Sequence, residues 1–188
     1  MNVYEQCPVL ESEHFLLRMV QKEDCKDLLK VYSDLQAVPL FNSDNCHGDD
    51  FHYQTEEQMM KAIEFWLFSY HNRYFVRWTI VDQTTGEGIG TVELFARESL
   101  DGVKNTGLLR LDLRSDYERL DVLKELLHLL QEPACRLFDS ESVTTKASSS
   151  AVIRRKALLE SGYDESAHPL IGHDGRKYYD YFVCPLHA

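Results

Sequence analysis

The stretch from Leu108 to Leu130 constrains the fold of this 188-residue chain more than any other part. In its first half, leucines at 109, 111 and 113 alternate with polar residues, which is the period of a strand with one buried face. In its second half, leucines recur at helical spacing, at 120, 123, 126, 127 and 130. The stretch predicts a strand, a turn and an amphipathic helix. Because the first N–H groups of a helix lack backbone acceptors, such a junction can bind an anion.

The turn between this strand and this helix contains acidic residues and no glycine. Ser115 and Glu118 fit a capping box, in which each side chain accepts a hydrogen bond from the other residue's backbone N–H. A helix start capped in this way satisfies its own first donors. The sequence leaves two interpretations open here, a self-capped helix start and an anion-binding site.

Composition predicts a single globular domain over residues 1–188. Hydrophobic residues make up 44% of the chain, enough for a full core at this length. The net charge of -11 argues against nucleic-acid binding, because phosphates require a basic face. It suits an amine-bearing substrate.

The cysteines and the apolar runs predict the compartment. Five cysteines lie scattered without C-x-x-C spacing, so we expect neither a disulfide framework nor a zinc site. No apolar run is long enough to span a membrane, and none follows a basic N-terminal start. We expect a cytoplasmic protein with free thiols and no membrane contact.

The remaining patterns predict an α/β fold (α+β-like), with a central mixed sheet of about 6–7 strands flanked by helices. Thr55 and Gln58 form a second capping box. The expected strands cover 15–20, 74–81, 89–96, 142–146 and 178–184. The expected helices cover 22–35, a stretch beginning after 55, a short piece at 133–138, and a stretch from the serines at 148–150 to 159.

The polar loop from Asn42 to Asp50 carries four acidic or histidine side chains in close succession. A metal site is one interpretation, but the spacing does not fit a calcium-binding EF-hand. We favour a solvated loop near a substrate entrance, and expect no metal. If the loop lines that entrance, its acids would attract a cationic amine.

Five further segments, taken in order, resemble a known family. They are Glu11–Arg18 followed by Lys22–Asp24, Val31–Asp34 with Phe41–Asn42, Thr79–Asp82 with Gly86–Thr91, Leu158–Tyr163, and Asp174–Asp180. Together they resemble the GNAT N-acetyltransferase superfamily, in particular the branch with the RimJ/RimL-type enzymes. The resemblance covers almost the whole chain.

The resemblance implies a GNAT fold and direct transfer of an acetyl group from acetyl-CoA to a primary amine. The acceptor would be an amine-bearing small molecule or a protein N-terminus, and a homodimer stays open. In this family the pantetheine arm pairs with the strand that corresponds to 109–113, and the diphosphate lies on the following loop and helix start. The implied cofactor-binding residues are Leu111, Asp112, Leu113, Arg114, Arg119, Leu120, Asp121, Val122 and Leu123.

The chain departs from the family pattern at that loop, which normally reads Gln/Arg-x-x-Gly-x-Gly/Ala. Those positions hold Glu118, Asp121 and Leu123, and the family's frequent general-acid tyrosine falls on Leu158. Like charges about 4 Å apart cost on the order of 4 kcal/mol at an intermediate dielectric, so carboxylates here would repel a diphosphate. Arg114 and Arg119 would offset part of that repulsion. The alternative function is a GNAT-fold binding or interaction protein without catalysis.

Two carboxylates on predicted strands are the candidates for a general base, Glu93 and Asp112. Arg110 and Arg114 flank Asp112 on one face, so we expect a lowered pKa and a salt-bridge role there. Glu93, between two apolar residues, is the better candidate. The basic residues Lys146 and 154–156 could meet the phosphates at the adenosine end of CoA or form a solvated face.

Overall fold

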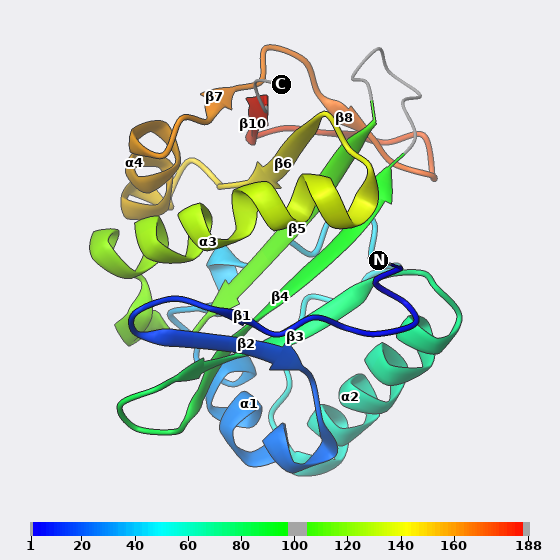
Figure 1. Cartoon of the computed structure of the whole chain (residues 1–188), viewed down its shortest axis with the longest axis vertical. Coiled ribbons are helices and arrows are strands. Elements are labelled where there is room, and N and C mark those ends of the chain that lie inside the picture. Colours follow the sequence, from blue (N-terminus) through cyan, green and yellow to red (C-terminus); the bar gives the residue numbers. More distant parts are fainter. Residues whose placement is uncertain (1, 98–104, 186–188) are drawn as a thin grey trace.

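A computed structural model of the chain describes residues 2–97 and 105–185 (Figure 1). Its centre is an eight-stranded sheet in the order β1-β2-β3-β4-β5-β6-β10-β7. Its strands are β1 (Leu10–Glu11), β2 (Phe15–Met19), β3 (Val76–Asp82), β4 (Gly88–Arg97), β5 (Thr106–Leu113), β6 (Ser142–Lys146), β10 (Tyr181–Pro185) and β7 (Asp164–Glu165). A second, two-stranded sheet pairs β8 (Leu170–Ile171) with β9 (Lys177–Tyr178).

Neighbouring strands run antiparallel, except that β5 and β6 are parallel, among the strands of the described ranges. The helices are α1 (Cys25–Tyr32), α2 (Glu56–His71), α3 (Leu120–Phe138) and α4 (Val152–Glu160), with short 3-10 turns at Lys22–Asp24, Val38–Leu40 and Ser115–Tyr117. The predicted mixed sheet flanked by helices is confirmed. None of the described helices combines the length and the apolar character that crossing a membrane requires.

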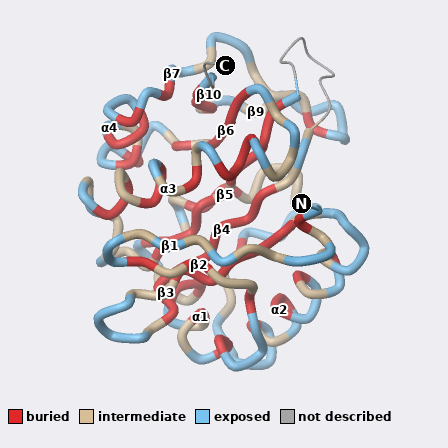
Figure 2. The backbone as a smooth tube through the Cα atoms, in the orientation of Figure 1, coloured by how far each residue is buried: buried red, intermediate tan, exposed pale blue. Residues whose placement is uncertain are grey.

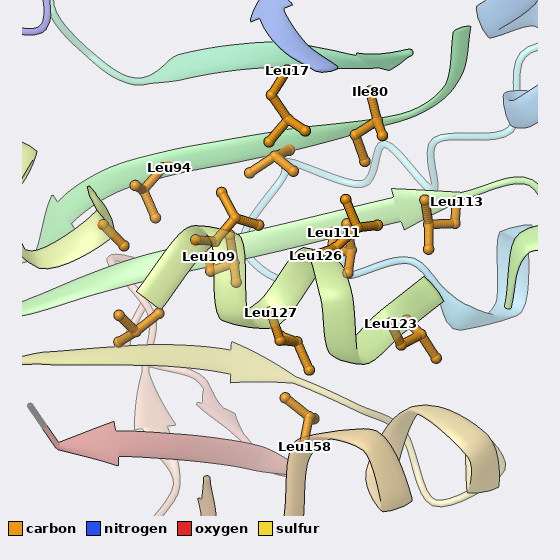
Figure 3. Close-up of a cluster of buried hydrophobic side chains, with 14 of the residues drawn as sticks. Leu17, Ile80, Leu94, Leu109, Leu111, Leu113, Leu123, Leu126, Leu127 and Leu158 are labelled. Carbon is orange, nitrogen blue, oxygen red and sulfur yellow. The ribbon is translucent and has the colours of Figure 1, made fainter. Parts of the chain in front are cut away.

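The larger hydrophobic core lies between the sheet and helices α3 and α4 (Figure 3). The alternating leucines of β5 point into it, and Leu109 and Leu113 are fully buried. They meet the leucine stripe of α3, of which Leu123 and Leu126 are fully buried. Burying each such side chain contributes roughly 2 kcal/mol. The strand–turn–helix predicted from these leucines is therefore the central packing unit of the domain.

A second hydrophobic cluster lies on the opposite face of the sheet, under α1 and α2. Tyr32 from α1 and Trp66 from α2 are its largest buried side chains, with ring centroids 5.5 Å apart. Helix α2 begins as predicted, because the Gln58 N–H donates to Thr55 Oγ1 at 3.2 Å. Figure 2 shows the buried residues concentrated along the central strands. The sheet thus separates two cores.

Three local predictions about the C-terminal half are wrong. The segment 133–138 is no separate piece but the last part of α3, which continues through Pro133. The serines at 148–150 do not cap α4, whose N-cap is Ala151 without a side-chain hydrogen bond. The expected last strand is interrupted, because Asp180 adopts a φ of 65°, so β9 and β10 belong to different sheets.

Candidate functional site

The two parallel strands β5 and β6 diverge in the middle of the sheet. Their pairing extends over four residues, from Thr106 opposite Ser142 to Leu109 opposite Thr145. Beyond that point, residues 110–113 of β5 pair with β4 along one edge only, among the strands that the structure describes. This open edge is the strand segment that the family resemblance assigns to the pantetheine arm.

A buried arginine from α4 lies on this open edge. Arg154 Nη1 donates to the Leu111 carbonyl at 2.7 Å and to the Leu40 carbonyl at 3.3 Å. Its side chain is only 4% exposed. The same guanidinium pairs with the carboxylate of Glu118, through Nη2 and through Nε. A group of the chain itself therefore fills the hydrogen-bonding position on Leu111.

The predicted capping box at the start of α3 is wrong. Residues 115–117 form a 3-10 turn, and the helix begins at Leu120 with Arg119 as an N-cap whose side chain makes no capping hydrogen bond. The Ser115 N–H donates instead to Asp34 Oδ2 at 2.9 Å. Glu118 turns to Arg154, because a charged guanidinium is a stronger partner for a carboxylate than one backbone N–H.

The other residues assigned to the cofactor are engaged with each other or with the core. Arg114 pairs with Asp116 at 2.7 Å, and Arg119 pairs with Asp121 at 3.2 Å. The Arg119 hydrogen bond holds the pKa of Asp121 below its usual value. Both arginines that were expected to offset the acidic turn are thus neutralised inside it. The remaining side chains belong to the main core or pack partly against it, namely those of Leu111, Leu113, Leu120, Val122 and Leu123.

Acetyl-CoA fits this region in part. The open edge of β5 supplies backbone groups for the pantetheine arm once Arg154 leaves Leu111. The start of α3 does not fit the diphosphate as it stands, because Glu118 and Asp121 lie there and no glycine allows close approach. The altered loop predicts this mismatch, and Arg154 adds a second obstacle because it occupies the Leu111 carbonyl on the strand edge.

A cavity of about 620 Å³ lies on the other face of the sheet, bounded by α2, the loop after residue 44, and strands β3 to β5. This volume lies in the range of small-molecule sites. Arg77, Glu93 and Arg110 form its floor. Arg110 is the first β5 residue beyond the last β5–β6 pair, so the cavity reaches the point where the two strands diverge. Its walls are aromatic, formed by Phe51, Tyr53, Phe65, Trp66 and Phe75.

The floor of the cavity is a buried network of charges. Glu93 lies between two guanidinium groups, paired through Oε2 with Arg77 and through Oε1 with Arg110 at 2.5 Å. Arg77 also donates to the Tyr32 hydroxyl at 2.9 Å and lies 3.4 Å from an oxygen of Asp112. The side chains of Arg77, Glu93 and Asp112 are at most 2% exposed.

The two predicted base candidates have pKa values shifted in opposite directions. Burial disfavours ionisation of Glu93, but the charges of Arg77 and Arg110 outweigh it and hold the Glu93 pKa below its usual value. Burial raises the pKa of Asp112, and Arg77 and the Tyr32 hydroxyl offset only part of that increase. The lowered pKa expected for Asp112 is wrong, because Arg110 pairs with Glu93 and Arg114 with Asp116.

The basic residues proposed for the adenosine end of CoA are mostly paired. Lys146 contacts both oxygens of Asp44 at 2.7 Å, and Arg155 contacts Glu165 at 2.7 Å.

The polar loop at 42–50 contributes residues to the lining of the cavity. Within the described ranges, no group of three acidic, histidine or cysteine side chains is arranged to hold a metal ion.

Sequence reasoning missed Arg77, and it placed Arg154 at the adenosine end of CoA or on a solvated face instead of in a buried pair with Glu118. Arg77 had a signal, because it interrupts the apolar strand 76–81 on the face opposite Val76 and Trp78. A charged residue inside such a strand requires a buried partner. Arg154 gave no such signal, since it stands in a basic run typical of a solvated helix face.

Comparison with solved structures identifies the fold. The chain superposes on RimL, a ribosomal L7/L12 alpha-N-protein acetyltransferase in complex with coenzyme A, with a TM-score of 0.69, 12% identity, and coverage of 95% of this chain and 98% of that chain. For the ribosomal-protein-S5-alanine acetyltransferase from Vibrio fischeri, the TM-score is 0.62 at 14% identity, with 94% of each chain covered. For a GNAT-family acetyltransferase from Bacillus anthracis, the TM-score is 0.66 at 9% identity, with 94% of this chain and 96% of that chain covered.

These similarities confirm the predicted resemblance at the level of the fold. The chain has the fold of the GNAT acetyltransferases, including enzymes that modify ribosomal proteins. Neither protein-family models nor curated proteins give a match to the sequence. The activity is therefore argued from the site.

Proposed function

We propose that this chain is a single-domain acyltransferase of GNAT fold that transfers an acetyl group from acetyl-CoA to a primary amine. One observation carries the proposal: the cavity reaches the point where β5 and β6 diverge. An amine bound there would lie beside the strand edge on which GNAT enzymes hold the pantetheine arm. The acceptor is the amine of a small molecule or of a protein N-terminus.

The floor of the cavity supports the reactivity of such an amine. Only the neutral amine is nucleophilic, and nearby positive charges together with burial favour the neutral form. Arg77 and Arg110 supply the charges, and aromatic side chains form much of the surrounding wall. Glu93 then orients the two arginines instead of removing a proton, which its lowered pKa disfavours. Proximity supplies much of the rate of such a transfer.

The binding test is isothermal titration calorimetry with acetyl-CoA. We expect saturable binding, and absence of heat at millimolar acetyl-CoA would contradict the proposal. The activity test follows release of free CoA thiol with a panel of primary amines, against reactions without amine. The cysteines of the described ranges are unpaired, which supports a reducing compartment such as the cytoplasm and requires a protein blank in any thiol assay.

A second function, a GNAT-fold binding protein without catalysis, is favoured by the Arg154–Glu118 pair. This pair occupies the Leu111 carbonyl and places a carboxylate just before α3, where a diphosphate would lie. In a protein that no longer binds acetyl-CoA, the Arg154–Glu118 pair would not have to open, so it could remain in place. Measured turnover with any amine acceptor eliminates this alternative.

A further inference from the structure

The charge of the cavity is opposite to that of the whole chain. The chain has a net charge of -11. The cavity lining nevertheless contains Lys61, Arg77 and Arg110 against two carboxylates, Asp49 and Glu93, besides two histidines. Lys61 is exposed and pairs with Glu57 at 2.6 Å, so the buried positive charge of the lining comes from the two arginines. Guanidinium groups at the base of a concave site favour an anion over a cation.

Two buried N–H groups on the cavity floor find no partner among the residues that the structure describes. Arg77 Nε and Arg110 Nε are both buried, and neither makes a hydrogen bond within the described residues. The two guanidinium groups already share Glu93 through their terminal nitrogens. Buried donors without partners are rare in folded proteins, and here both belong to residues that line a cavity. Both Nε atoms are inaccessible to solvent, so an acceptor group of a ligand reaches them only when the two side chains shift toward the cavity.

The cavity offers little to a cation. The carboxylate of Asp49 accepts from the Tyr53 hydroxyl at 2.7 Å, and Glu93 is held by two arginines. The ring of Trp66, the best surface for a cation, already carries the Arg77 guanidinium at 4.2 Å from its centroid. An ammonium group would therefore compete with partners that these side chains already have.

We propose that this cavity binds a small aromatic carboxylate, with its carboxylate beside the guanidinium groups of Arg77 and Arg110 and its ring between the aromatic walls. Guanidinium groups suit this role because their N–H donors match a carboxylate in geometry and charge. The inference rests on the proposed function for one step only: if the chain is an acetyltransferase, its acceptor is an aromatic amino acid. Binding of the carboxylate itself does not depend on catalysis.

Two ligands of similar size share an aromatic ring and differ in charge, so comparing them isolates the contribution of the carboxylate to binding. Binding of 3-phenylpropionate and of phenethylamine is measured by calorimetry and by ligand-observed NMR, without acetyl-CoA. We expect the carboxylate to bind at least tenfold more tightly than the amine. Equal affinities, or tighter binding of the amine, would overturn the inference.

Variants at Arg110 test the assigned contact, because this arginine is less buried than Arg77. Arg110→Gln is expected to weaken 3-phenylpropionate binding by tenfold or more. Arg110→Lys is expected to weaken it by a smaller factor, since lysine keeps the positive charge but lacks the paired N–H donors of a guanidinium group. The control is Arg136→Gln, which changes an exposed arginine of α3 paired with Glu132. It should bind as the unchanged protein does. Thermal unfolding of each variant verifies that it is folded.

Acetylation assays distinguish the two proposals. If 3-phenylpropionate binds and no amine releases CoA thiol, the cavity assignment stands and the acetyltransferase proposal fails. If phenethylamine and phenylalanine are acetylated with the same kcat/KM, the acetyltransferase proposal stands and the carboxylate site is wrong. Only the two proposals together predict that phenylalanine is acetylated with a lower KM than phenethylamine and that Arg110→Gln removes this difference.

Discussion

The open edge of β5 and the cavity on the other face of the sheet differ in how their charged groups are satisfied. At the edge, Arg154, Glu118 and the Leu111 carbonyl satisfy one another, so the region is closed by the chain itself. In the cavity, Arg77 and Arg110 share one carboxylate and each keeps a buried N–H without a partner. A site that keeps unsatisfied donors is prepared for a ligand, whereas a fully paired site must open first.

The largest expected effect comes from removing the arginine that holds the cavity floor together. Arg77→Met leaves Glu93 and Asp112 buried with fewer cationic partners. Removing one member of a buried ion pair costs about 3–5 kcal/mol, because the other charge stays buried without compensation. The free energy of unfolding, measured by urea denaturation, should fall by about this amount.

The matched control for this variant is an exposed ion pair. Lys22 contacts Glu64 at 2.6 Å, with both side chains more than half exposed. Lys22→Met should cost no more than about 1 kcal/mol, because solvent screens such pairs. Equal losses in the two variants would show that the Arg77 network is not a buried ionic cluster.

The next effect concerns the closed edge and acetyl-CoA. Glu118→Gln removes a carboxylate from the position of the diphosphate and weakens the hold on Arg154. We expect acetyl-CoA to bind about tenfold more tightly, a change of about 1.4 kcal/mol, measured by calorimetry. Binding of 3-phenylpropionate in the cavity should stay unchanged.

A glutamate within α3 is the control for Glu118. Glu132 pairs with Arg136 on the exposed face of α3. Glu132→Gln changes the net charge of the protein equally, so it separates a local effect from a general one. If both variants raise the affinity alike, the Arg154–Glu118 pair does not obstruct the cofactor.

The fold was predictable from sequence because periodic leucines record which face each element buries. The alternation in β5 and the stripe in α3 predicted the central packing unit, and Thr55 with Gln58 predicted the start of α2. The same kind of local pattern failed at Ser115 and Glu118. There the outcome depends on Arg154, which lies 36 residues away from Glu118 in the sequence.

The candidate site was predictable only in its location. The family resemblance predicts the β5 edge as the cofactor site, and the place of Glu93 between two apolar strand residues predicts a special role for that carboxylate. Its partners Arg77 and Arg110 come from two neighbouring strands, and their register cannot be read from local sequence. The ionisation of Glu93 and Asp112 depends on such long-range contacts, which is why the pKa direction of Asp112 was predicted wrongly.

The pH dependence of stability separates these two carboxylates, although both contact Arg77. The Glu93 pKa is lowered from 4.5, so its contribution is present above pH 4.5 and is lost as the pH falls through the folded value. The Asp112 pKa is raised from 3.8, so its contribution is present below pH 3.8 and is lost as the pH rises through the folded value. The two carboxylates therefore change the stability of the protein in opposite directions as the pH is varied.

Urea unfolding between pH 3 and neutral pH measures both contributions. Relative to the unchanged protein, Glu93→Gln should lose less stability on acidification, and Asp112→Asn should lose less stability as the pH rises. The result is read from the slope of the unfolding free energy against pH and not from its absolute value, since both substitutions also disturb the buried network. Slopes altered in the same direction would contradict the assigned pKa directions.

The smallest expected effect comes from the exposed pair at the start of α3. Asp121 is 72% exposed and pairs with Arg119, so replacing it removes a carboxylate near the diphosphate position and frees an arginine. Because exposed pairs are worth no more than about 1 kcal/mol, Asp121→Gly should tighten acetyl-CoA binding by about threefold. Asp121→Asn keeps the shape without the charge and should give most of that gain. If Asp121→Gly tightens binding and Asp121→Asn does not, then the limit on cofactor binding at this turn is how closely the backbone can approach the diphosphate, and not the charge of the side chain. Leu123→Ala cannot serve this purpose, because Leu123 is fully buried and its truncation costs about 2–5 kcal/mol of stability.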